Sequence, residues 1–333
     1  MVDRFIVRSL PRLNEVFGGG IPRESMIHIY GPYQAGKTLL IYQLIYELVG
    51  QGLGNALYID TEASFRSNFS REMGRRFRER FGNEVNILDV KLSRSVPLKG
   101  GKKMTVSEFK RYLSTILDDL GIVYDLEDLS DAARFFFRKV DLEAESRGRG
   151  NIYLLDRVDL SLLLKLMDVE AEVERKGQKT EVRIKGLSDP TTSPLSKFIR
   201  KYRVMYLVLD SIGLLVKNLA VSLSDLPARA VVTNLVVGNL IRLASEYGLV
   251  VFATNHESKN PTGKGFHSFY GGYAIGYGFK YSLYLSRVGK SRRRLVGERS
   301  PLLPEFEFTL DLVIKDDGFY EVSNDGAPDE ATG

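Results

Sequence analysis

Short apolar runs of strand length alternate along this chain with longer segments whose apolar residues recur at helical spacing. The runs within 25–31, 55–60 and 203–211 are almost continuously apolar, which is typical of strands buried on both faces of a parallel sheet. The segment 39–50 carries leucines at helical spacing, and glycines close it. The alternation predicts an α/β fold in which helices flank a mostly parallel central sheet.

The same reading predicts elements further along the chain. Helices are expected at about 67–81 and 160–177, and strands at 151–159 and 179–186. The exposed strand at 179–186 is followed by a loop rich in serine, threonine and proline, so a second small insertion is expected over 176–202.

Residues 84–150 are predicted to form an α-helical insertion. Thr105 and Glu108 make a capping box at the start of one helix, which ends near Gly121, and a second helix is expected over 127–146. Basic residues precede the first helix, and acidic residues follow it. This charge pattern indicates either a docking surface for another protein or ordinary amphipathic helices that cover the edge of the core.

Composition narrows the class of protein. The chain has 333 residues, of which 44% are hydrophobic, and it contains no cysteine, so disulfides and thiolate metal sites are excluded. Its histidines, at 28, 256 and 267, are too scattered to suggest a zinc site. No apolar window is long enough to span a bilayer, and the charged first residues do not resemble a secretory signal. The sequence predicts a soluble cytoplasmic protein with no membrane partner, and its net charge of +5 suits a polyanionic partner.

One motif between the first predicted strand and helix carries chemical information. The residues GPYQAGKT match the template G-x-x-x-x-G-K-[ST], in which backbone N–H groups surround a phosphate at the positive end of a helix. The lysine neutralises phosphate charge and the threonine hydroxyl is offered to Mg²⁺. The alternative is a turn with a solvated lysine. The candidate phosphate-binding residues are Gly31, Pro32, Tyr33, Gln34, Ala35, Gly36, Lys37 and Thr38.

Two other strands end in carboxylates. Asp210 ends the run within 203–211, where the carboxyl ends of parallel strands face the ligand crevice, so it is the candidate to hold Mg²⁺ with Thr38. Its alternative role is to cap the next turn. Glu62 follows the run at 55–60. It either orients and deprotonates water near a γ-phosphate or caps the helix that follows.

Several motifs in order resemble the RecA-type recombinases, in particular the archaeal RadA and RadB group. They are LNEVFGGGIPRESMIHIYGPYQAGKT, YIDTEASFRSNF, VLDSIGLL and the S-P-x-L-P-E pattern near 300, and together they cover roughly 11–82 and 203–322. The resemblance implies a RecA-like P-loop NTPase core over 1–322 and a frayed tail at 323–333. It also implies ATP and Mg²⁺ as ligands, with Glu62 as the catalytic glutamate.

The sequence departs from this family at two site positions. His256 stands where the family has a glutamine that senses the γ-phosphate, and Arg299 replaces the aspartate that caps ATP on a neighbouring subunit. No counterpart of the family's helix-hairpin-helix domain is found. The sequence therefore leaves undecided whether the chain forms an oligomer, and it gives no support for assembly into long filaments.

The family's two DNA-binding loops correspond to 216–229 and 257–271. The second mixes cations with aromatic residues, the pattern expected for single-stranded nucleic acid, although an ordinary glycine-rich surface loop is the alternative. The candidate DNA-binding residues are Lys217, Arg229, Lys259, Lys264 and His267.

The resemblance thus predicts an ATP-hydrolysing paralogue that acts on single-stranded DNA in recombinational repair and assists a main recombinase. In this interpretation Lys37, Glu62 and His256 serve catalysis, and the insertion at 84–150 contacts a recombinase or repair protein. The alternatives are a nucleotide-gated module that binds another protein, and a KaiC-like signalling ATPase with no role on DNA.

Overall fold

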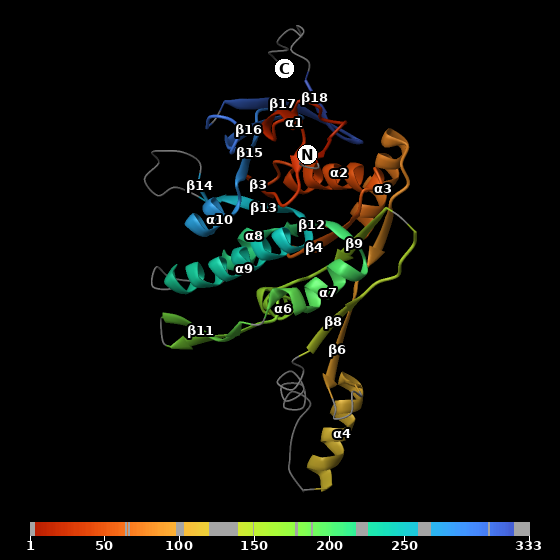
Figure 1. The fold of residues 1–333 in the computed structure, drawn as a ribbon, viewed down its shortest axis with the longest axis vertical. Helices are drawn as coiled ribbons and strands as arrows, with labels where there is room; N and C mark the ends of the chain where they lie inside the picture. Colours follow the sequence, from red (N-terminus) through yellow and green to blue (C-terminus); the bar gives the residue numbers. More distant parts are fainter. Residues whose placement is uncertain are drawn as a thin grey trace.

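A computed structural model gives the fold of this chain. The structure describes residues 4–63, 65, 67–97, 103–119, 139–148, 150–176, 179–187, 189–217, 226–258, 268–305 and 307–322. Figure 1 shows a large central sheet with helices on both sides, and a narrower part that extends away from it through β6, β8 and α4.

The central sheet confirms the predicted α/β class. Its strand order is β18-β17-β16-β15-β3-β13-β12-β4-β9-β5. The strands from β15 to β5 run parallel to one another, and β16, β17 and β18 continue the sheet as antiparallel neighbours. The bounds are β3 (Met26–Gly31), β4 (Asn55–Asp60), β5 (Asn86–Asp89), β9 (Asn151–Leu155), β12 (Val204–Asp210), β13 (Val250–Ser258), β15 (Tyr281–Arg287), β16 (Arg292–Arg299), β17 (Phe308–Lys315) and β18 (Gly318–Glu321).

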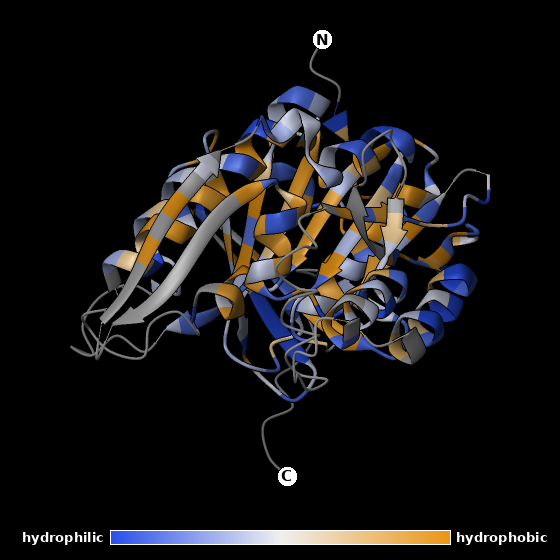
Figure 2. Ribbon diagram, turned by 90° about the horizontal axis from the view of Figure 1, so that it is seen from below, coloured by the Kyte–Doolittle hydropathy of each residue, from blue (hydrophilic) through white to orange (hydrophobic). Residues whose placement is uncertain are grey.

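Helices cover both faces of this sheet, so its central strands are apolar on both sides. Successive residues of one strand belong to different cores: Tyr206 and Val208 of β12 pack in one core, whereas Leu207 and Leu209 pack in the other. Figure 2 shows these apolar strands between the helical layers. The helices are α1 (Leu13–Val16), α2 (Lys37–Gly50), α3 (Ser67–Phe81), α4 (Val106–Asp119), α6 (Leu160–Leu166), α7 (Pro194–Lys201), α8 (Ile212–Lys217), α9 (Leu226–Tyr247) and α10 (Gly272–Gly278), with a 3-10 turn at η1 (Pro190–Thr192).

Smaller sheets surround the central one. A short pair, β1 with β2, lies near the start of the described chain, β10 pairs with β11, and β14 pairs with the end of β13. A three-stranded sheet has the order β7-β6-β8. Their bounds are β1 (Arg4–Phe5), β2 (Ile21–Pro22), β6 (Lys91–Pro97), β7 (Lys103–Thr105), β8 (Lys139–Glu143), β10 (Val169–Lys176), β11 (Lys179–Leu187) and β14 (Ser268–Phe269).

The segment 84–150 contains strands as well as a helix. The capping box is confirmed, because the Glu108 carboxylate accepts from the Thr105 N–H at 2.7 Å and the Thr105 hydroxyl accepts from the Glu108 N–H at 3.3 Å. The expected helix over 127–146 is wrong at 139–143, which is strand β8. Val140 and Leu142 alternate there into the core, and β8 pairs along β6. Residues 120–138 lie outside the described chain, and the role of the insertion as a separate unit stays a prediction.

The helix expected over 160–177 is also wrong in its second half. The Asp159 carboxylate caps α6 by accepting from Leu162 N at 2.7 Å, but the helix ends at Leu166. Asp168 then takes a left-handed backbone conformation, with φ of 57°, and the chain continues as β10. Pairing of β10 with β11 along its whole length outweighs the helical propensity of its glutamates and alanine. Among the described helices, none has the length and apolar character that crossing a bilayer requires.

Candidate active site

The motif at 31–38 forms the turn between β3 and α2, as expected. Gly31 has φ of 155°, and a Cβ added there would lie 2.1 Å from the carbonyl oxygen of Leu285 on the neighbouring strand. Gly36 precedes α2 with φ of 100°. Both positions therefore require glycine, one for close backbone approach and one for its dihedral angle. The turn ends at the amino end of α2, where the first backbone N–H groups have no partner within the helix.

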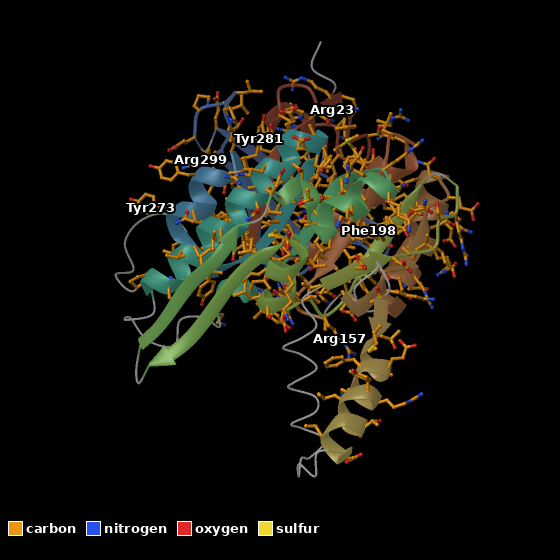
Figure 3. The ribbon with its side chains drawn as sticks, turned by 60° about the horizontal axis from the view of Figure 1, so that its bottom comes forward. Arg23, Arg157, Phe198, Tyr273, Tyr281 and Arg299 are labelled. Atoms are coloured by element: carbon orange, nitrogen blue, oxygen red, sulfur yellow. The ribbon has the colours of Figure 1, made fainter. Side chains whose placement is uncertain are left out.

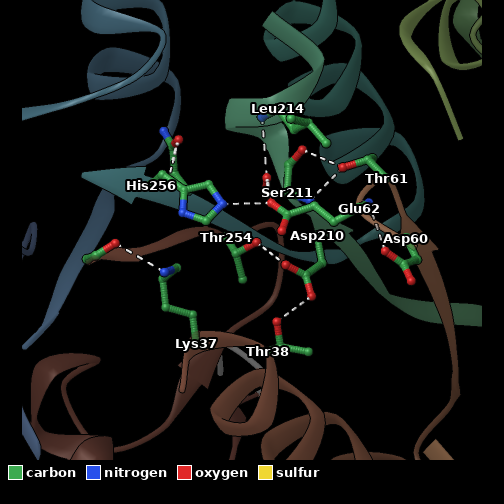
Figure 4. A network of polar contacts seen from close by, with 12 residues as sticks. Lys37, Thr38, Asp60, Thr61, Glu62, Asp210, Ser211, Leu214, Thr254 and His256 are labelled. Carbon is green, nitrogen blue, oxygen red and sulfur yellow. Dashed lines mark hydrogen bonds and ion pairs between the residues drawn. The ribbon is translucent and has the colours of Figure 1, made fainter. Parts of the chain in front are cut away.

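Lys37 lies folded back over this turn (Figure 4). Its side chain is buried, and its Nζ donates to the carbonyl oxygens of Gly31 at 3.1 Å and Pro32 at 2.9 Å. Burial lowers the pKa of Lys37, while the carboxylates of Asp210 and Glu62 oppose that effect. The ammonium group thus sits in a place where an added phosphate would compensate its charge better than two neutral carbonyls do.

Asp210, at the end of β12, is held by three hydroxyl groups. Its carboxylate accepts from Thr38 Oγ1 at 2.9 Å, from Tyr58 OH at 2.6 Å and from Thr254 Oγ1. The side chain is 2% exposed, and burial raises its pKa. Hydroxyls satisfy the oxygen lone pairs but bring no positive charge, so this carboxylate lacks the compensation that a cation would supply.

The residues around Asp210 fit a magnesium ion that is bound chiefly by its other ligands. Within the described part of the chain, no group of three or more Asp, Glu, His or Cys side chains is placed to hold a metal. Mg²⁺ usually retains several waters and takes one or two carboxylates plus substrate phosphates. Thr38 and Asp210 are hydrogen-bonded to each other and are the two side chains that could hold such an ion.

Glu62 and His256 contact each other across the carboxyl ends of β4 and β13. His256 Nε2 lies 2.8 Å from Glu62 Oε1, and the same carboxylate oxygen accepts from Ser211 Oγ. The hydrogen bond from His256 is the largest cause that lowers the pKa of Glu62, and burial acts in the opposite direction. These contacts direct the Glu62 carboxylate towards β12 and β13 rather than leaving it to solvent (Figure 4).

Asp60 fixes the turn that presents Glu62. Its carboxylate accepts from the backbone N–H of Glu62 at 2.9 Å and of Phe65 at 2.7 Å. A further link joins this turn to β12, because Thr61 N donates to the Asp210 carbonyl at 2.7 Å and Ser211 N donates to Thr61 Oγ1 at 2.7 Å. The ends of β4 and β12 are therefore hydrogen-bonded to each other through backbone groups and the Thr61 hydroxyl.

These side chains line one cleft of about 280 Å³. It contains Lys37 and Thr38 of the turn together with Glu62, Asp210 and His256, so the five side chains predicted to serve catalysis or to hold Mg²⁺ meet there. A larger hollow of about 490 Å³ lies beside the opposite ends of β4 and β12, but it is lined by glycines, apolar residues, Asn55 and two arginines and contains no acidic group. The chemistry of the smaller cleft makes it the candidate active site.

The predicted DNA-binding residues are only partly described. Lys217 ends α8, with its Nζ 5.6 Å from the centre of the Tyr270 ring. Arg229 lies in the first turn of α9 and is half-buried. Lys259, Lys264 and His267 lie outside the described residues. The role of all five on DNA stays a prediction.

Sequence reasoning missed the groups that support the site. Tyr58 and Thr254 hold Asp210, and Ser211 holds Glu62. Tyr58 and Ser211 lie within the quoted motifs, and Thr254 stands two residues before His256, so position in or beside the motifs was the available signal. Arg293 belongs to a run of three arginines at 292–294 and was not among the candidate site residues. It is 6% exposed, and its Nε donates to the carbonyl of Ala35 at 2.8 Å.

Comparisons with known proteins agree with this geometry. A family model described as the KaiC ATPase matches residues 8–124, which include the turn at 31–38 and Glu62. The DNA repair and recombination protein RadA of Methanocorpusculum labreanum is 37% identical over 70 residues, which are 19% of this chain and 21% of that protein. Over these residues the chain is similar to ATPases of the RecA family.

Two further relatives match over similar lengths. Protein RecA of Delftia acidovorans is 41% identical over 56 residues, 17% of this chain and 15% of that protein. The meiotic recombination protein DLH1 of Candida albicans is 34% identical over 81 residues, 23% of this chain and 24% of that protein. The chain thus spans only about a fifth of the length of the curated relatives it matches.

Proposed function

We propose that this chain binds ATP with Mg²⁺ and hydrolyses it in the cleft between 31–38, Glu62 and Asp210. The single observation that carries this proposal is the convergence of a phosphate-binding turn with two acidic strand ends in one cleft. The backbone N–H groups at the start of α2 would surround the β-phosphate, and Lys37 would leave its carbonyl partners for phosphate oxygens. Thr38 and Asp210 would hold Mg²⁺, which supplies charge neutralisation of the triphosphate when bound.

Glu62 is proposed to position the attacking water and to accept its proton. The water oxygen forms a bond to the γ-phosphorus, the bond to the β,γ-bridging oxygen breaks, and ADP leaves with that oxygen. Contact with His256 keeps Glu62 ionised but makes it a weaker base. A γ-phosphate that attracts His256 would release Glu62 at the moment when the water needs it. His256 would then report the phosphate to β13 and to the segment that follows it, as predicted from the sequence.

The test is ATP turnover by the wild-type chain and by Glu62→Gln and Lys37→Ala. Glu62→Gln preserves shape and hydrogen bonding but removes the base, so turnover should fall by about 100-fold or more. Lys37→Ala should weaken ATP binding. Glu246→Gln changes an exposed glutamate on α9 and serves as the matched control, with turnover unchanged. Full turnover in Glu62→Gln would refute the catalytic assignment.

We further propose that the chain acts on single-stranded DNA in recombinational repair, as an accessory to a main recombinase. The name of its relative RadA supports a role in repair and recombination, and the name of DLH1 supports a role in recombination. The surface around α10 supports the ligand. Tyr273 and Tyr277 are 83% and 75% exposed, and their rings stack at 5.8 Å with 17° between their planes. Exposed aromatic rings near cations are suited to stacking with unpaired bases.

A cation stands beside these tyrosines. The Arg299 side chain is exposed and donates to the carbonyl of Gly276, on the turn of α10 between the two rings. Figure 3 shows Arg299 and Tyr273 on the same side of the molecule, next to α10. Arg299 is thus proposed to contact phosphate, although the family has an aspartate at this position.

Fluorescence anisotropy with an oligo-dT strand across a salt series tests this ligand. Tyr273→Ala with Tyr277→Ala should lower affinity by about tenfold, since stacking contributes about 1–3 kcal/mol per base. Tyr112→Ala, an exposed tyrosine on α4, is the control and should bind as the wild type does. Lys217→Ala and Arg299→Ala should reduce the dependence of affinity on salt.

A KaiC-like ATPase or a nucleotide-gated protein-binding module without DNA is the second candidate. The KaiC family model, which covers the turn and Glu62, favours it. It predicts no salt-sensitive binding of oligo-dT by the wild-type chain. The segment 84–150 would then dock a partner protein.

A further inference from the structure

Arg293 is an arginine turned inward within a run of basic residues. Residues 292–294 are all arginine on strand β16, and the alternation of the strand exposes Arg292 and Arg294 while Arg293 is buried. Arg294 pairs with Asp311 at 2.7 Å. In contrast, no carboxylate among the described residues forms an ion pair with Arg293.

The Arg293 guanidinium instead joins the phosphate-binding turn to a second turn. Its Nε donates to Ala35 O at 2.8 Å, and a terminal nitrogen lies 3.5 Å from Gln34 O. Its other terminal nitrogen donates to the carbonyls of Gly289 at 3.2 Å and Lys290 at 3.4 Å in the β15–β16 connection, and to that of Arg292 at 2.9 Å at the start of β16. That nitrogen carries two N–H groups, so one of them is shared between two of the three carbonyls. The planar fork of an arginine can reach both turns at once, whereas a lysine cannot.

The two peptide groups held by Arg293 lead directly into α2. In a trans peptide the carbonyl and the next N–H point in opposite directions. Holding the Ala35 carbonyl towards Arg293 therefore turns the Gly36 N–H away from Arg293. In a phosphate-binding turn this N–H is among those that face the phosphate. A donor that fixes a carbonyl also polarises the attached N–H, which strengthens its bond to an anion.

We propose that Arg293 is a positioning residue for nucleotide binding, which orients the peptide group between Ala35 and Gly36 so that the turn is ready to receive the β-phosphate. The inference rests on the proposed function. We therefore expect the additional affinity that the β-phosphate contributes to require Arg293. The affinity that the nucleoside and the α-phosphate contribute should not depend on Arg293.

The experiment compares the dissociation constants of fluorescently labelled AMP and ADP for wild type, Arg293→Met and Arg293→Lys. The wild type should bind ADP more tightly than AMP. Arg293→Met should lose about tenfold or more of ADP affinity, the size expected for a hydrogen bond to a charged group, with little change for AMP. Arg293→Lys should recover part of it, because it restores the charge and one hydrogen bond. Arg294→Met, which removes the exposed neighbour, should leave both affinities within about twofold of wild type.

A purely structural role would weaken AMP and ADP equally, and that outcome would overturn the proposal. Wild-type ADP affinity in Arg293→Met would overturn it as well. If Arg293→Met does not fold, the ratio of AMP to ADP affinity is measured in Arg293→Lys instead, and an unchanged ratio would overturn the proposal. A wild-type chain that binds no adenine nucleotide would refute the proposed function, and this inference with it.

Discussion

Replacing Gly31 with alanine tests how tightly the phosphate-binding turn is built into the sheet. The added Cβ would lie 2.1 Å from the Leu285 carbonyl oxygen and 3.1 Å from its carbonyl carbon. Side-chain Cβ atoms do not approach backbone oxygen so closely, so the backbone would have to shift by about 1 Å. Strand pairing resists this shift, because β3 and β15 are hydrogen-bonded neighbours. Ile29 lies opposite Leu283, and Tyr30 lies opposite Tyr284, which precedes Leu285.

The expected cost is the sum of two effects. A strained backbone conformation costs about 1–3 kcal/mol, and overpacking in the interior costs about 1–3 kcal/mol more. The smaller freedom of alanine in the unfolded chain returns about 0.4–1 kcal/mol. We therefore expect Gly31→Ala to lower the free energy of unfolding by about 3 kcal/mol. Since Gly31 begins the turn that is proposed to bind phosphate, a shift of its backbone should weaken ADP binding as well.

Urea unfolding of the nucleotide-free protein, followed by circular dichroism, measures the first effect. Gly238→Ala on α9 is the matched control, because a Cβ added there meets no atom within 4 Å and an alanine favours the helix by about 0.8–1 kcal/mol. An unfolding free energy for Gly31→Ala within about 1 kcal/mol of wild type would refute the packing argument.

Two further predictions concern the acidic strand ends. Tyr58→Phe removes one of three hydroxyls from the buried Asp210 carboxylate and should lower the free energy of unfolding by about 2 kcal/mol. Tyr206→Phe is its control: the Tyr206 hydroxyl is buried without a hydrogen-bond partner in the described chain, so its loss should cost less than about 0.5 kcal/mol, and equal losses in the two variants would contradict this assignment. Burial raises the pKa of Asp60 to about 6, above the usual value of 3.8, so the folded chain retains this proton to higher pH than the unfolded chain does. Ionised Asp60 therefore opposes folding above pH 6, and this penalty vanishes as the pH falls from about 6 to 3.8, a change of ~3 kcal/mol at most. Urea unfolding across this pH range should show wild type gaining stability relative to Asp60→Asn as the pH falls, and a difference that does not vary with pH would contradict the raised pKa.

Local patterns predicted the elements that carry the site. The run within 25–31, the glycines of the turn and the leucines of 39–50 are contiguous in sequence, so strand, turn and helix could be read directly. The capping box of Thr105 and Glu108 is equally local. The same reading was wrong at 139–143 and 169–176, because strand pairing with distant partners decided those conformations.

Contacts between distant residues were the other limit of prediction. Glu62 meets His256, which is 194 residues away, and Asp210 accepts from Tyr58, which is 152 residues away. The sequence indicated that each carboxylate ends a strand, but it did not indicate which distant side chains Glu62 and Asp210 contact. Only the order of the strands, with β12 between β4 and β13, brings these side chains together.

The sequence by itself thus determined the chemistry that is available: a turn that matches the phosphate-binding template, two strand-end acids and no thiolate. Those properties follow from residue identity and short spacing. The tertiary structure decided which groups support them, since Arg293 reaches the Ala35 carbonyl across 258 residues of sequence. In a run of three arginines, the alternation of a strand and the packing behind the turn select the one that points inward. That selection depends on the neighbouring strands, and no local pattern encodes it.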